Sequence, residues 1–116
     1  MKSDLPGRTF AFAVRVVKLC QALDANPGVS RTLGRQLLRS GTSIGANVEE
    51  GQASQSRADF VAKYSIACKE ARETHYWLRL LAETSILPTD RLHPITDECN
   101  ELIAILTTIV KKSRSG

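Results

Sequence analysis

The residues best placed for chemistry in this 116-residue sequence form a polar row with helical spacing. Residues three and four apart share one face of a helix, and one such face carries Gln36, Ser40, Ser43, Asn47 and Glu50. Ser and Asn favour helices less than Lys and Glu do, so we expect these short side chains to form specific hydrogen bonds. Three interpretations fit the row: a face that simply meets water, a network that fixes the register of a helix or subunit contact, and a ligand or catalytic cluster at a pore. We favour the network over the cluster.

Cationic side chains form two further rows at helical spacing. One lies within residues 8–18 and the other within residues 31–39, in a chain with a net charge of +4 and a pI near 9.2. Such rows commonly just face solvent. Repeated around an oligomer, however, they would form a positive belt that accumulates phosphate contacts and reads the backbone rather than the base sequence. The candidate nucleic-acid-binding residues are therefore Arg8, Arg15, Lys18, Arg31, Arg35 and Arg39.

The cysteines and histidines predict neither a metal site nor a nucleophile. Cys20, Cys68 and Cys99 lie far apart with no C-x-x-C spacing, which disfavours zinc. Neither His75 nor His93 has a glutamate three positions before it, as a di-iron bundle requires. Cys68 and His75 would be about two helical turns apart, too far for a nucleophile and its base. We expect no enzyme activity, no cofactor and no bound metal, with the three cysteines filling the core.

Hydrophobic periodicity and turn residues predict one all-α domain over residues 1–116, an up-down antiparallel four-helix bundle. The expected helices cover residues 8–25, 30–50, 56–84 and 89–112. The helix-end signals are Ser30 as N-cap of the second helix, Gly51 just beyond its end, and Ser56 with Asp59 as a capping box for the third.

Glycine spacing in the second helix predicts a close neighbour. Gly34, Gly41 and Gly45 lie together beside the apolar seam that contains Leu37 and Ile44. Each glycine costs roughly 1 kcal/mol relative to alanine inside a helix. We therefore expect another backbone to approach this flank closely.

The first helix is apolar on nearly all sides. In addition to its core seam it carries Phe10, Val14 and Val17 on the opposite side. A helix that is apolar all round is buried on more than one side, and in so small a chain we expect the second side to meet another subunit. The sequence itself therefore predicts a homo-oligomer.

The third helix carries three oppositely charged pairs at i,i+4 spacing. They are Asp59 with Lys63, Lys69 with Glu73, and Arg79 with Glu83, and they predict a solvated surface laced with ion pairs. Trp77 in this helix has two interpretations, a stacking platform for bases and a buried anchor at an interface, and we favour the anchor.

The second helix also carries a family resemblance. Its segment QLLRSGTSIGANVEEG is similar to a signature of the form Q-x-x-R…S-I-x-x-N-I-A-E-G, through Gln36, Arg39, Ser43, Ile44, Asn47, Glu50 and Gly51. That signature is typical of small bacterial proteins named for members encoded in intervening sequences of 23S rRNA genes, also called S23 proteins. Glu49 replaces the usual alanine, and the third segment, YSIACKEARETHYWLRLL, lacks the common I-A-x-G-S core.

This resemblance implies a four-helix bundle that assembles into a cyclic homopentamer, with no established enzyme activity. It also implies a distant likeness to the bundle proteins that serve as nucleic-acid-binding accessories to reverse transcriptases in diversity-generating retroelements.

Two functions of different classes remain open from the sequence. The first is an oligomeric accessory protein that binds RNA or DNA, and the second is an oligomeric scaffold that binds a protein partner without touching nucleic acid. Charge reversal at Arg31 and Arg35 would abolish binding under the first and spare the partner complex under the second.

The N-terminus has no apolar core of signal-peptide type and no apolar run approaches a membrane span, so we expect a cytoplasmic protein without membrane contact.

Overall fold

The computed structural model describes residues 4–115, which form four α-helices and no strand. The helices are α1 (Leu5–Asp24), α2 (Val29–Gln52), α3 (Arg57–Glu83) and α4 (Thr89–Ser115). Each begins and ends within three residues of the boundary predicted from the sequence. The all-α prediction is therefore confirmed.

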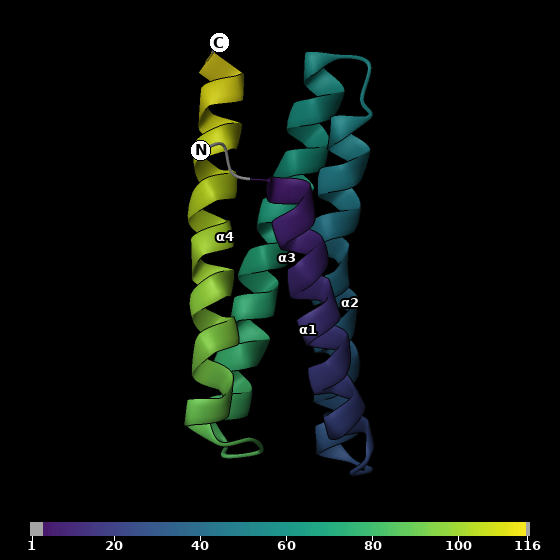
Figure 1. Cartoon of the computed structure of the whole chain (residues 1–116), viewed down its shortest axis with the longest axis vertical. Coiled ribbons are helices and arrows are strands. Elements are labelled where there is room, and N and C mark those ends of the chain that lie inside the picture. The colour runs from purple at the N-terminus through teal and green to yellow at the C-terminus, as the bar shows by residue number, and fades with distance from the viewer. Residues whose placement is uncertain (1–3, 116) are drawn as a thin grey trace.

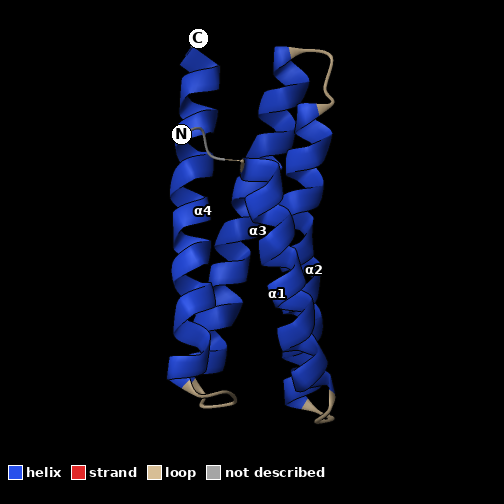
Figure 2. Ribbon diagram, in the orientation of Figure 1, coloured by secondary structure: helices blue, strands red, loops and turns tan. Residues whose placement is uncertain are grey.

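The helices form an elongated bundle with extents of 46 × 22 × 21 Å. Consecutive helices run in opposite directions and are joined by short turns (Figure 1, Figure 2). α2 packs along both α1 and α3, and α3 packs along α4, whereas α1 touches α4 over only a short length. α4 continues past the level at which α1 begins (Figure 1). The largest side chains of the core are Tyr64, Phe12, Leu23, Leu37, Ile44, Leu78, Leu81, Leu92, Leu102 and Leu106.

Glycines of α2 let α1 approach closely, as their spacing predicted. A Cβ atom at Gly41 would lie 2.8 Å from a methyl carbon of the buried Val16. A Cβ at Gly45 would lie 3.3 Å from the carbonyl oxygen of Thr9, so at this point the neighbour is backbone. The thiol of Cys20 also donates a hydrogen bond to the carbonyl oxygen of Gly34, at 3.2 Å. The contact between α1 and α2 therefore leaves no room for ordinary side chains on this flank of α2.

Two predicted helix-end signals are wrong. α2 begins at Val29 with Gly28 as its N-cap, and the Ser30 hydroxyl instead donates to the carbonyl oxygen of Leu23 in α1, at 3.0 Å. Gly51 lies inside α2 rather than beyond it, and a Cβ there would lie 2.6 Å from the ring of Tyr64. Both residues serve contacts between helices, which the local sequence does not reveal.

The predicted N-cap of α3 is confirmed. The Ser56 hydroxyl accepts a hydrogen bond from the backbone N–H of Asp59, at 3.0 Å. This bond satisfies one of the N–H groups that have no partner within the helix.

We expect Gly41→Ala to destabilise the fold, although alanine is the better helix former by roughly 1 kcal/mol. The added methyl group would overlap the stiff, fully buried Val16, and overpacking of this kind costs about 1–3 kcal/mol. Urea denaturation measures the free energy of unfolding.

The double variant Val16→Ala/Gly41→Ala provides the control for Gly41→Ala. It removes the atoms that the new methyl group would meet, so its loss of stability should be smaller than the sum of the two single losses. A Gly41→Ala protein that is more stable than the wild type would show that this contact is loose.

Candidate functional site

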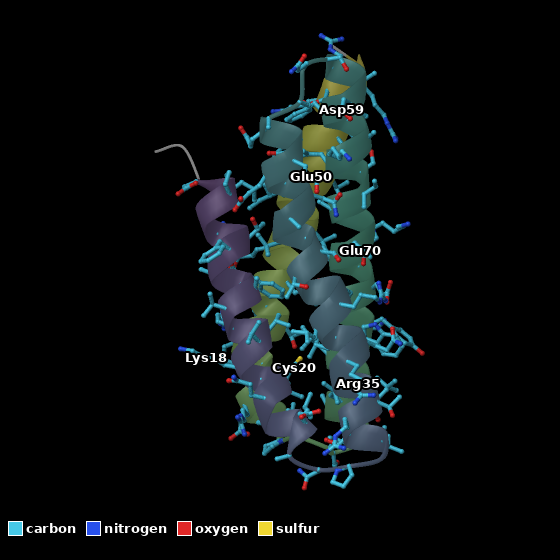
Figure 3. All side chains as sticks on the ribbon, turned by 90° about the vertical axis from the view of Figure 1, so that its right-hand side faces the viewer. Lys18, Cys20, Arg35, Glu50, Asp59 and Glu70 are labelled. Carbon is cyan, nitrogen blue, oxygen red and sulfur yellow. The ribbon has the colours of Figure 1, made fainter. Side chains whose placement is uncertain are left out.

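The side chains of the polar row form hydrogen bonds within α2 and contacts to α3. The Ser43 hydroxyl donates to the carbonyl oxygen of Arg39 at 2.7 Å, and the Asn47 amide donates to the carbonyl oxygen of Ser43 at 2.8 Å. At the upper end of the row, Glu50 forms an ion pair with Lys63 of α3 at 3.0 Å, and this hydrogen-bonded contact raises the pKa of Lys63. Figure 3 shows Glu50 and Glu70 on this side of the molecule.

Arg39 lies next to the polar row and connects its residue Gln36 to α3. Its guanidinium donates to Gln36 at 3.2 Å, lies 3.5 Å from the carboxylate of Glu70, and forms a direct ion pair with Glu73. The Glu73 carboxylate also accepts a hydrogen bond from the indole N–H of Trp77, at 3.0 Å. Arg39 of α2 thus binds two carboxylates of α3, and one of these, that of Glu73, also binds Trp77.

Ser40 and Thr74 join the same two helices inside the core. Both are fully buried, and the Thr74 hydroxyl lies 2.9 Å from the Ser40 hydroxyl and 2.8 Å from the carbonyl oxygen of Glu70. No buried side-chain nitrogen or oxygen within residues 4–115 lacks a partner. Within the row, Ser40 and Glu50 contact α3, whereas Ser43 and Asn47 bond to carbonyl oxygens of α2 itself. The interpretation of the row as a network that fixes the register of a helix contact stays a prediction.

The six cations predicted to bind nucleic acid do not share one surface. Three of them are held by carboxylates. Arg8 bridges Glu98 at 2.7 Å and Glu101 at 2.9 Å, and these contacts raise its pKa further. Arg31 pairs with Asp24 at 3.2 Å. Arg39 pairs with carboxylates of α3, as described above.

The other three candidate cations are exposed. Arg15, Lys18 and Arg35 take part in no ion pair among the described residues. Figure 3 shows Lys18 extending away from α1 and Arg35 on the lower part of α2. The assignment of nucleic-acid binding to these six residues stays a prediction.

The ion pairs predicted along α3 are wrong. Within residues 4–115, no ion pair joins Asp59 to Lys63, Lys69 to Glu73, or Arg79 to Glu83. Lys63 and Glu73 are instead drawn to α2, by Glu50 and Arg39. In these two pairs a partner on a neighbouring helix has replaced the local one, whereas Arg79 and Glu83 form no ion pair within residues 4–115.

This exchange exposes a row of cations that the sequence analysis missed. Lys69, Arg72 and Arg79 are exposed and have no carboxylate partner among residues 4–115. Tyr76 lies between Arg72 and Arg79 at helical spacing, is 49% exposed, and has the Arg79 guanidinium 5.8 Å from its ring centre. The signal for this row was the spacing 69, 72, 76, 79, of which we assign only Lys69 and Arg79 to local ion pairs from the sequence.

α1 presents an apolar face to solvent. Phe10 is 62% exposed, and Val14 and Val17 are each a little over one third exposed. Leu38 of the neighbouring α2 is exposed to the same extent. Val17 and Leu38 also line a groove of about 380 Å³ between α1 and α2, together with Cys20, Gln21, Asp24, Arg31, Gly34 and Arg35. The prediction that α1 has a second apolar side is confirmed.

The cysteines are free, and two of them are buried. Burial raises the pKa of the Cys20 thiol to about 11 and that of the Cys99 thiol to about 12. Cys68 is half-buried, with its sulfur 3.4 Å from the Thr107 hydroxyl.

Burial, together with the nearby Arg79, lowers the pKa of His75. Residues 4–115 contain no group of three or more His, Cys, Asp or Glu side chains that could hold a metal ion.

Comparisons with known proteins place the chain in a family. The family model of the 23S rRNA-intervening sequence protein matches residues 2–108. A solved protein of unknown function from the S23 ribosomal protein family of Bacteroides thetaiotaomicron is 41% identical, with a TM-score of 0.85. The match covers 92% of this chain and 98% of that one. The chain belongs to the 23S rRNA-intervening sequence protein family, as the signature in α2 indicated.

No curated protein matches the chain. Among the described residues, no helix is both long enough and apolar enough to cross a membrane.

We expect Cys20 and Cys99 to resist thiol reagents in the native protein. Only the thiolate reacts, and at about pH 8 the raised pKa values leave about one Cys20 thiol in a thousand ionised, and fewer at Cys99. Mass spectrometry after brief alkylation should find modified Cys68 first, with Cys20 and Cys99 modified only on addition of denaturant. Rapid modification of Cys20 in a Cys68→Ser variant would contradict the packing of α1 on α2.

Proposed function

We propose that this protein is a non-enzymatic, oligomeric accessory protein that binds the backbone of RNA or DNA. The observation that carries the proposal is the excess of exposed cations without carboxylate partners within residues 4–115, in a chain with a net charge of +4. Phosphate contacts of this kind release condensed counterions and need no concave site. The family name describes relatives and does not itself assign this activity to the chain.

The proposed assembly is a ring of identical subunits, with five favoured by the resemblance described above. Support for self-association comes from the apolar side of α1, where Phe10, Val14 and Val17 face solvent beside Leu38 of α2. Burial of such surface contributes roughly 25 cal/mol per Å², so a contiguous apolar face of this kind favours association. A ring would repeat each unpaired cation around its axis and so multiply a modest positive patch.

We expect Phe10→Asp to dissociate the oligomer. The substitution places a charge at the most exposed apolar position of α1 and leaves the buried seam of that helix unchanged. Light scattering coupled to gel filtration should give a mass of several subunits for the wild type and of one subunit, 12.7 kDa, for the variant.

The matched control is Val29→Asp. Val29 is 67% exposed, yet it lies at the start of α2, away from the apolar face. This variant should keep the wild-type mass. A wild-type protein that is monomeric at micromolar concentration would overturn the proposed assembly.

We expect the wild-type protein to bind nucleic acid with an affinity that falls linearly with salt on a double logarithmic plot. The slope should be about −0.7 per neutralised phosphate for a single strand and about −0.9 for B-form DNA. Fluorescence anisotropy with labelled RNA and DNA across a salt series measures it. An absence of binding even at low salt would overturn the proposed function and leave a scaffold for a protein partner.

A further inference from the structure

We infer that the outer side of α3 binds single-stranded nucleic acid, with Lys69, Arg72 and Arg79 holding the backbone and Tyr76 stacking on a base. This inference rests on the proposed function and specifies the binding surface and the form of the nucleic acid. The sequence analysis had placed that surface on α1 and α2.

The first argument is the distribution of charge on α3. Glu70 and Glu73 point toward α2, where Arg39 binds both of them. With these two carboxylates engaged by Arg39, Lys69 and Arg72 form no ion pair within residues 4–115. These two cations keep their full charge for an anion, whereas Arg8 and Arg31 would first have to leave the carboxylates that hold them.

The second argument is the alignment of the side chains. Residues 65, 69, 72, 76 and 79 alternate by four and three, so they form one straight row on α3. At 1.5 Å per residue, Lys69 and Arg79 are about 15 Å apart along the axis. The guanidinium of Arg114 in α4 donates to the Ser65 hydroxyl at 3.3 Å, so the row continues with a fourth cation from the neighbouring helix.

The third argument is the aromatic ring within the row. Tyr76 is half exposed, lies edge-on to Trp77 with ring centres 5.1 Å apart, and has Arg79 above its ring at 5.8 Å. Trp77 is itself half-buried and bonded to Glu73, so it holds Tyr76 in place and does not serve as an exposed platform. An ordered aromatic ring flanked by cations is the arrangement that binds unpaired bases.

A duplex fits this row less well than a single strand does. Bases within a duplex are already stacked and offer no free face to Tyr76. Stacking on an aromatic ring tolerates any base, and the cations contact phosphates, so we expect little preference for sequence. RNA and DNA single strands share this chemistry.

Two triple variants with the same change in net charge test whether the binding surface lies on α3. Lys69→Gln/Arg72→Gln/Arg79→Gln removes three cations from α3, and the control Arg15→Gln/Lys18→Gln/Arg35→Gln removes three exposed cations from α1 and α2. Each change lowers the net charge from +4 to +1 (4 − 3 = 1). All six residues are exposed, so both proteins should fold, which circular dichroism and light scattering verify.

The probe is a short, labelled single-stranded RNA of mixed sequence, compared with the DNA of the same sequence and with the corresponding duplex. The α3 variant should bind the single strands more than about tenfold more weakly than the wild type, with the salt slope reduced by about 2. The control variant should stay within a few-fold of the wild type. Tyr76→Ala should weaken single-strand binding about tenfold and leave duplex binding unchanged, whereas Tyr76→Phe should bind like the wild type.

Trp77 provides a local readout, since it is the only tryptophan of the chain and contacts Tyr76. Addition of unlabelled single strand should change its fluorescence in the wild type and in the control triple variant, and should not do so in the α3 variant.

Each other outcome overturns a stated part. Binding kept in the α3 variant, whatever the control does, or lost equally in both variants, overturns the assignment to α3 while the proposed function stands. Duplex binding as tight as single-strand binding, together with an unaffected Tyr76→Ala variant, overturns the stacking role. A wild-type protein that binds no nucleic acid overturns both the inference and the proposed function.

Discussion

The close approach of α1 to α2 is the constraint on which the other features of this bundle depend. Gly41 and Gly45 remove the side chains that would separate the two helices, and Val16 and the backbone of Thr9 occupy that space. Since α1 is committed to α2, it touches α4 over only a short length, where Arg8 joins Glu98 and Glu101. The apolar side of α1 that faces away from the core, with Phe10, Val14 and Val17, is therefore exposed.

A second constraint is the position of Arg39, which determines which carboxylates remain free beside the cations of α3. Arg39 binds the carboxylates of Glu70 and Glu73, so these two groups are engaged with α2 and are not available to the cations of α3. The i,i+4 spacing predicts an ion pair between Lys69 and Glu73. In the structure Glu73 instead pairs with Arg39, and Lys69 is exposed to solvent. The family signature in α2, which includes Arg39 and Gln36, acts on the surface chemistry of α3 through this contact.

The sequence predicts what depends on periodicity and misses what depends on the partner helix. The four helices, the burial of Cys20 and Cys99, and the exposed apolar side of α1 follow from residue spacing alone. The roles of Ser30 and Gly51 were misread as helix ends because the atoms that they meet, Leu23 and Tyr64, belong to other helices. Two of the ion pairs predicted along α3 failed for the same reason, because local i,i+4 spacing cannot show that Arg39 binds Glu73 and that Glu50 binds Lys63.

The most direct test of the account is to map where a bound nucleic acid touches the protein. Ultraviolet crosslinking of a single-stranded RNA to the wild-type protein, followed by mass spectrometry of the digested protein, identifies the contacted residues without any substitution. We expect crosslinks to concentrate on α3 around Tyr76, with further sites near Lys69 and Arg114. Crosslinks confined to α1 and the first half of α2, around Lys18 and Arg35, would contradict it.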